Sequence, residues 1–173
     1  QYLPKLNEIV SANADGIIQR KQISLHSYKN IPIADSFWES GDHSSRTWKF
    51  SMHSFAPLNL LMAVGAWGDV ETLVRDWIKL YGEINPETLG QFPWHDHATA
   101  LRLDCLSLMA VASDGPDFPD LAQQHATLLL REEFYSKHTN HGYDQALALV
   151  LASRVFSEFY DTSEWLKVGL DRL

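Results

Sequence analysis

The stretch FPWHDHATALRLDCLSLMAVA, residues 92–112, decides how the chain is expected to fold. It opens with Pro93 and polar residues, which are typical of a connection, and continues as a run rich in Ala and Leu, which favour helices. The sequence Asp114-Gly115-Pro116 then breaks the helical pattern. We therefore expect a helix over about residues 95–112, with His97 near its start.

The same arrangement occurs once before and once after this helix. His53, His97 and His141 are each 44 residues apart (97 − 53 and 141 − 97), and an Ala- and Leu-rich run follows each of them. Each repeat has room for two helices, and turn residues separate the two. Stacked or circular arrays of helical hairpins show repeats of this length. The chain is therefore expected to be all-α with three hairpins, although eight histidines leave room for chance spacing.

Apolar periodicity and turn residues predict the remaining elements. No segment shows sustained alternation of apolar and polar residues, so we expect no strands. A length of 173 residues fits one domain, with an N-terminal helix and loop over 1–45 and the hairpins over 46–173. Besides residues 95–112, helices are expected over about 6–23 (interrupted by Asp15-Gly16), 48–66 (kinked at or beginning at Pro57), 70–81 after Gly68-Asp69, 118–134 after Asp117, 140–159, and from Asp161 or Thr162 onward, with a loop over 31–45.

The composition describes a folded, acidic chain. Apolar residues make up 45% and the net charge is −8, which argues against binding to nucleic acid or to an anionic membrane surface. No run approaches the roughly 18 apolar residues that a membrane span needs. No signal peptide is visible, so the chain is expected to be cytosolic or already processed. The single cysteine, Cys105, excludes an internal disulfide and is expected to be a buried thiol.

Three stretches resemble the N-terminal helical domain of heparinase II/III-type polysaccharide lyases: TWKFSMHSFAPLNLL (47–61), FPWHDHATALRL (92–103) and NHGYDQALAL (140–149). Their order and spacing also fit, and the resemblance covers roughly residues 36–173. It implies an incomplete α/α toroid, normally continued by further hairpins and by a C-terminal β-sandwich domain of the same protein. It also implies a bacterial protein located in the periplasm or outside the cell, acting on an acidic polysaccharide or oligosaccharide without a cofactor.

The resemblance implies cleavage of uronic-acid-containing polysaccharide by β-elimination. The family's Asn-His pair falls on Asn140 and His141, which would neutralise the uronate carboxylate. The family's catalytic Tyr normally lies on a later helix, beyond Leu173, and a further His comes from the β-sandwich. The chain is therefore expected to carry part of a site and to show little lyase activity alone.

The residue chemistry supports these roles independently. A C5 proton is weakly acidic, so the carboxylate charge must be offset before that proton can leave. The Asn140 amide can donate to a carboxylate, His141 can transfer a proton near neutral pH, and a helix N-terminus favours an anion. The alternative is that Asn140 only caps the helix. Tyr143 is a weaker candidate for the proton donor and is expected to pack instead.

A second group of residues is expected to contribute to substrate binding. Arg102 interrupts an apolar run, so it either binds a uronate carboxylate bidentately or pairs with an acid such as Asp104. His97 is expected to lie in the same cleft. Trp94 and Trp48 could stack on sugar rings, although tryptophans at such positions are often core. His53 is also expected to contribute to substrate binding.

Two other functions remain open from the sequence. His95, Asp96 and His97, or His138 with His141, could be metal ligands, but the H-E-x-x-H pattern is absent and we expect no catalytic metal. A metal-dependent hydrolase is therefore the weaker alternative. The stronger alternative is a glycan-binding or scaffolding domain that has lost its catalytic groups. The sequence does not identify the polysaccharide.

Overall fold

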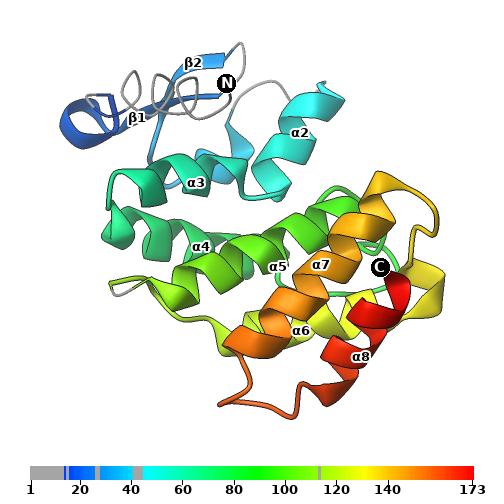
Figure 1. The fold of residues 1–173 in the computed structure, drawn as a ribbon. Helices are drawn as coiled ribbons and strands as arrows, with labels where there is room; N and C mark the ends of the chain where they lie inside the picture. Colours follow the sequence, from blue (N-terminus) through cyan, green and yellow to red (C-terminus); the bar gives the residue numbers. More distant parts are fainter. Residues whose placement is uncertain (1–13, 15, 26–27, 41–44, 113) are drawn as a thin grey trace, which may run out of the picture. The chain divides into compact units, whose positions relative to one another are not determined.

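The computed structural model describes residues 14, 16–25, 28–40, 45–112 and 114–173, and this part is mostly helical (Figure 1). The all-α class is therefore confirmed. Backbone contacts divide the chain into two compact units, one of residues 1–52 with 56–83 and one of residues 53–55 with 84–173. The boundary predicted at residue 45 lies inside the first unit. The toroid stays a prediction.

The first unit contains a small antiparallel sheet, so the prediction of no strands is wrong. Strand β1 (Gln22–Leu25) pairs with β2 (Tyr28–Pro32), and Ile23 lies opposite Ile31, both buried. Two strands of four and five residues are too short to show sustained alternation, which explains why the sequence did not reveal them. The helix predicted over 6–23 falls largely outside the described residues. Its described part ends at Arg20, before β1 begins.

The loop predicted over 31–45 is partly structured. It contains the end of β2 and a short 3-10 helix, η1 (Phe37–Glu39). Phe37 and Trp38 of η1 are buried, and the Trp38 indole N–H donates to the carbonyl of Leu73 at 2.8 Å. Two aromatic side chains in this segment therefore belong to the core of the first unit.

The helix predicted over 48–66 is broken, as Pro57 suggested. Helix α2 (Arg46–His53) is separated from α3 (Ala56–Ala63) at Ser54 and Phe55. Phe55 has a φ of 62°, a left-handed conformation that no helix can continue through, and its ring is completely buried. Helix α4 (Trp67–Tyr81) begins three residues before the predicted start, and its apolar face is buried as predicted.

The second unit contains two helical hairpins. Helix α5 (Asp96–Val111) packs against α6 (Pro119–Leu130) and α7 (Asn140–Val155), and α7 packs against α8 (Ser163–Arg172); the 3-10 helix η2 (Glu132–Phe134) follows α6 (Figure 1). The predicted helix starts are accurate to about two residues. The ends are less accurate, because α6 and α7 each stop four residues early.

The caps of these helices differ in detail from the predictions. Thr139 caps α7, since its hydroxyl accepts a hydrogen bond from the Gly142 backbone N–H at 3.2 Å. Asn140 is therefore the first helical residue, and the alternative that it serves as the cap is wrong. Phe118, rather than Asp117, occupies the N-cap position of α6. Asp161 does assist the start of α8 by accepting from the Ser163 backbone N–H.

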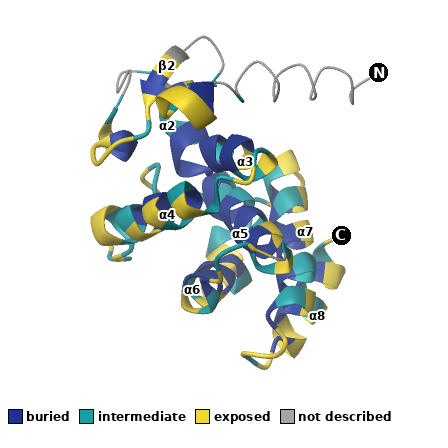
Figure 2. Ribbon diagram, turned by 90° about the vertical axis from the view of Figure 1, so that its left-hand side faces the viewer, coloured by how far each residue is buried: buried dark blue, intermediate teal, exposed yellow. Residues whose placement is uncertain are grey.

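Helices α5 and α7 pack against each other in the second unit, and α5 has buried residues around most of its circumference, whereas Tyr143 and Leu147 of α7 are exposed (Figure 2). Small side chains let them approach their neighbours. At Gly169 of α8, an added Cβ would lie 2.9 Å from the carbonyl oxygen of Ala146, so α8 can pack on α7 at this distance only with glycine there. Across the described residues, no helix is both long and apolar enough to cross a membrane.

Candidate functional site

The starts of α5 and α7 bring together five titratable side chains in the second unit. His95 is the N-cap residue of α5, and Asp96 and His97 are in its first turn. His141 and Asp144 are in the first turns of α7. Because α5 and α7 pack side by side, residues 44 apart in the sequence meet in space. We refer to these five residues as the histidine cluster.

Each of two stacked imidazoles in the histidine cluster has its own carboxylate. The rings of His97 and His141 stack with centroids 4.1 Å apart and planes 20° apart. Nε2 of His97 lies 2.7 Å from Oδ2 of Asp144, and Nδ1 of His141 lies 3.2 Å from Oδ2 of Asp96. The two rings therefore use different nitrogens for their carboxylates. The ring of His95 meets His141 edge-on at 5.9 Å.

Asp96 is the most connected member of the histidine cluster. Its Oδ2 also accepts a hydrogen bond from the Ser136 hydroxyl, and its Oδ1 lies 2.8 Å from Nδ1 of His95. Burial alone would raise the pKa of the Asp96 carboxyl. Hydrogen bonds from Ser136 and from the His97 backbone N–H, together with His95 and His141, outweigh that effect and lower the pKa below its usual value. Asp96 is therefore an anion at neutral pH.

Asn140 and His141 present polar groups to solvent beside this anion. Asn140 is exposed, and the His141 side chain is 35% exposed. The Nε2 atom of His141 forms no hydrogen bond with any of the described residues. Backbone N–H groups of the first helical turn and the helix dipole add positive potential at this end of α7. The structure thus brings His97 together with His141 and its neighbour Asn140, whereas the sequence had placed His97 in one cleft with Arg102.

Arg102 lies elsewhere, in the interior of the second unit. It is 0% exposed, and its guanidinium donates to the carbonyl oxygens of His53 and Pro93 and to Nε2 of His125, the last at 2.8 Å. The ring of Trp94 stacks near it, with 5.2 Å between Cζ and the ring centroid. Arg102 therefore binds main-chain carbonyls and an imidazole in the core. The sequence had predicted that it binds either a uronate carboxylate or an acidic side chain, and neither prediction describes these partners.

His125 also belongs to this interior, although no role was predicted for it from the sequence. It lies on the apolar face of α6, and Nδ1 faces the carbonyl of Leu121 at 2.8 Å. Burial, reinforced by the charge of Arg102, lowers the pKa of the His125 imidazole well below its usual value. Neutral His125 therefore donates from Nδ1 and accepts from Arg102 at Nε2. The sequence feature that indicates such a buried histidine is its position among leucines on one face of the helix.

The remaining predicted binding residues are buried. Trp94 is 0% exposed and packs against His125 and Arg102, with a ring-centroid distance of 5.0 Å to His125. His53 is nearly buried and supplies a carbonyl to Arg102. Trp48 belongs to the first unit, where its indole N–H donates to the carbonyl of Ser40 at 2.8 Å. These positions favour the packing interpretation of both tryptophans over stacking on sugar.

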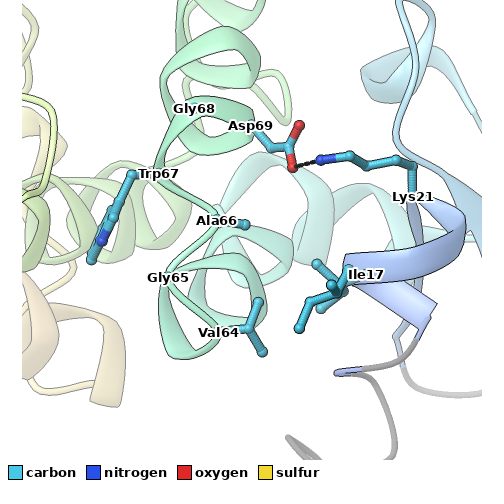
Figure 3. A pocket seen from close by; sticks show the side chains of 9 residues that line it. Ile17, Lys21, Val64, Gly65, Ala66, Trp67, Gly68 and Asp69 are labelled. Carbon is cyan, nitrogen blue, oxygen red and sulfur yellow. Dashed lines mark hydrogen bonds and ion pairs between the residues drawn. The ribbon is translucent and has the colours of Figure 1, made fainter.

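Two surface pockets contain no residue of the histidine cluster. One of about 480 Å³ is in the first unit, between Ile17 and the turn before α4, where Lys21 pairs with Asp69 at 2.5 Å (Figure 3). The other, of about 350 Å³, is in the second unit and is lined mainly by residues of α6, including Gln123, together with Ile84 and the C-cap residue Arg131. Neither pocket includes a residue that the sequence predicted to act on substrate.

No cluster of three or more His, Cys, Asp or Glu side chains is arranged to hold a metal ion in the described part of the chain. The histidine cluster instead pairs its imidazoles with carboxylates. Comparisons of the chain with family models, with curated proteins and with solved structures found no match. The resemblance to polysaccharide lyases therefore stays a prediction that rests on the quoted residues.

Proposed function

We propose that the starts of α5 and α7 form the substrate-facing part of a polysaccharide lyase that cleaves uronic-acid-containing polysaccharide by β-elimination. The observation that carries this proposal is the exposed Asn140 beside His141, whose ring is held by a carboxylate and stacked on a second histidine. This arrangement offers an uncharged donor for an anion and a proton-transferring group within one helical turn.

The proposed reaction divides its tasks among these groups. Asn140 and the first turn of α7 bind the uronate carboxylate, which lowers the energy of the carbanion formed when the C5 proton leaves. The electron pair of that C–H bond forms a double bond between C4 and C5, and the bond from C4 to the leaving oxygen breaks. A base takes the C5 proton and an acid supplies one to the leaving oxygen. The free Nε2 of His141 suits it to proton transfer with the bound uronate.

The net charge of −8 does not rule out an acidic substrate at this site, because the local charges differ from the total. Lys137 and His138 are exposed in the loop that leads into α7. The carboxylates of Asp96 and Asp144 each lie within hydrogen-bonding distance of a histidine ring nitrogen. Charges beyond about 8 Å are largely screened at physiological ionic strength. Lys137 and the first turn of α7 are therefore the positive groups at this end of the helix, and the uronate would have to bind on their side of the Asp96 and Asp144 carboxylates.

Asn140→Asp tests this proposal more sharply than removal of the side chain. A carboxylate at the first position of a helix favours the helix by about 0.3–1 kcal/mol, so the folded chain should be equally or more stable. The same carboxylate would repel a uronate. We expect turnover by the protein that carries this chain to fall by orders of magnitude, both in this variant and in Asn140→Ala. The readout is the ultraviolet absorbance of the unsaturated product.

Binding to the chain itself separates catalysis from recognition. Nuclear magnetic resonance of the Asn140 side-chain amide should show a shift on adding an oligouronate and none on adding its neutral methyl ester. Gln123→Ala, at an exposed position of α6, is the matched control and should leave binding unchanged. Equal shifts with the ester would refute carboxylate recognition. Carboxylate-specific binding without turnover in the whole protein would instead indicate a glycan-binding domain.

A further inference from the structure

We propose that Asp96 is a positioning residue which, supported by Ser136, holds His141 in the tautomer with its proton on Nδ1 and leaves Nε2 for the substrate. The inference rests on the proposed function, because the proton handled at Nε2 is that of the bound uronate. Asp96 would act only through His141.

The contacts of Asp96 dictate which nitrogen of His141 carries the proton. A carboxylate accepts hydrogen bonds and donates none, so the nitrogen that faces Oδ2 at 3.2 Å must be the protonated one. The hydrogen bond at one imidazole nitrogen determines the state of the other. The lone pair of neutral His141 therefore lies on Nε2, on the side of the ring away from Asp96.

Ser136 keeps the carboxylate in place, and α7 keeps Ser136 in place. The backbone N–H of Ser136 donates to the buried side chain of Gln145 at 3.0 Å, and Gln145 donates in turn to the carbonyl of Phe134 at 2.8 Å. Gly142 lets this loop lie against the first turn of α7, since a Cβ there would be 2.3 Å from the Ser136 carbonyl oxygen. The Ser136 hydroxyl is thereby fixed against Asp96.

His97 restricts the His141 ring from its other side. The stacking at 4.1 Å covers one face of the ring, and Asp144 holds His97 in turn at 2.7 Å. A flip of the His141 ring about its Cβ–Cγ bond would put Cδ2 in the place of Nδ1 and so break the hydrogen bond to Asp96. The stacked neighbour and the edge-on ring of His95 both oppose that motion. The cluster thus favours one ring orientation as well as one tautomer.

The test is the tautomer of His141, read from the ¹⁵N shifts of both ring nitrogens at about pH 9, well above the ordinary histidine pKa of about 6.5. We expect the Nδ1–H form in the unaltered chain. In Asp96→Asn an amide can donate as well as accept, so the Nδ1–H to Nε2–H ratio should fall by about tenfold, as loss of a charge-assisted hydrogen bond implies. Ser136→Ala should lower it less.

Asp144→Asn is the matched control, because it removes the carboxylate of His97 and keeps that of His141. Its tautomer change should appear at His97, with His141 still in the Nδ1–H form. A His141 found in the Nε2–H form in the unaltered chain would overturn the inference, whether or not Asp96→Asn folds. So would an Asp96→Asn variant with an unchanged ratio.

Turnover then shows whether the positioning matters for the reaction. In the protein that carries this chain, Asp96→Asn should lower kcat by about 10²-fold and leave KM nearly unchanged, because Asn140 still binds the carboxylate. An unchanged kcat alongside a changed tautomer would overturn the positioning role. Absence of any turnover in the unaltered protein would count against the proposed function. The tautomer of His141 is measured without turnover, so it tests the positioning by Asp96 separately from the proposed function.

Discussion

Arg102→Met removes the buried guanidinium and keeps a side chain of similar length in its place. Four acceptors then lose a hydrogen bond from Arg102: the carbonyl oxygens of His53 and Pro93, the Nε2 atom of His125 and the Thr99 hydroxyl. Each unsatisfied buried acceptor costs about 1–3 kcal/mol, and relief from burying the charge offsets part of the sum. We expect the free energy of unfolding to fall by about 3 kcal/mol, a large part of the stability of a chain of this size.

Urea unfolding followed by far-ultraviolet circular dichroism measures this loss. Arg131→Met is the matched control, because Arg131 is an exposed arginine of the same unit, and its change should stay within about 0.5 kcal/mol. Arg102→Lys should fall between the two, since one ammonium group lacks the planar fork that reaches both carbonyls. A loss below about 1 kcal/mol for Arg102→Met would refute the view that this residue joins the parts of the second unit.

Three further predictions concern the same unit. The folded chain keeps His125 neutral, whereas the unfolded chain binds a proton below about pH 6.5, so stability is full above that pH and falls below it by up to about 1.4 kcal/mol per pH unit. His125→Gln should flatten that part of the urea-unfolding profile against pH, and an unchanged slope would contradict the assignment. Gly142→Ala should cost about 1–3 kcal/mol in urea unfolding, because its Cβ would meet the Ser136 carbonyl; a neutral effect would show that the loop moves freely. Burial raises the pKa of the Cys105 thiol, so a thiol reagent at neutral pH should label it only in denaturant, and rapid labelling of the folded chain would be the contrary result.

The helices of the second unit were predictable because local signals specify them. Ala- and Leu-rich runs between Pro- and Gly-containing turns indicated where these helices start. In the first unit, Pro57 likewise indicated that the helix predicted over 48–66 is interrupted. The sheet was not predictable, because strands of four and five residues leave almost no periodic signal. The ends of α6 and α7 were misplaced because Phe and other apolar residues continue past the last helical turn.

The candidate site was predictable only for residues that are neighbours in the sequence. Asn140 and His141 are adjacent in the sequence, and their position at a helix start could be read directly. Asp144 was missed because its partner, His97, lies on another helix, 47 residues away. Ser136 was missed for the same reason, since its contact with Asp96 spans 40 residues. The role of Arg102 depended on main-chain carbonyls, which carry no sequence signal at all.

The short left-handed turn at Phe55 has a consequence for the order in which the chain can fold. Residues 53–55 belong to the second unit although the residues on both sides belong to the first. During synthesis from the N-terminus, His53 is made well before Arg102. The carbonyl that accepts a hydrogen bond from the guanidinium is therefore already present when Arg102 emerges. A chain shortened to begin at Ile84 would lack it. Such a fragment would bury a cation with an incomplete set of ligands, however well its own helices formed.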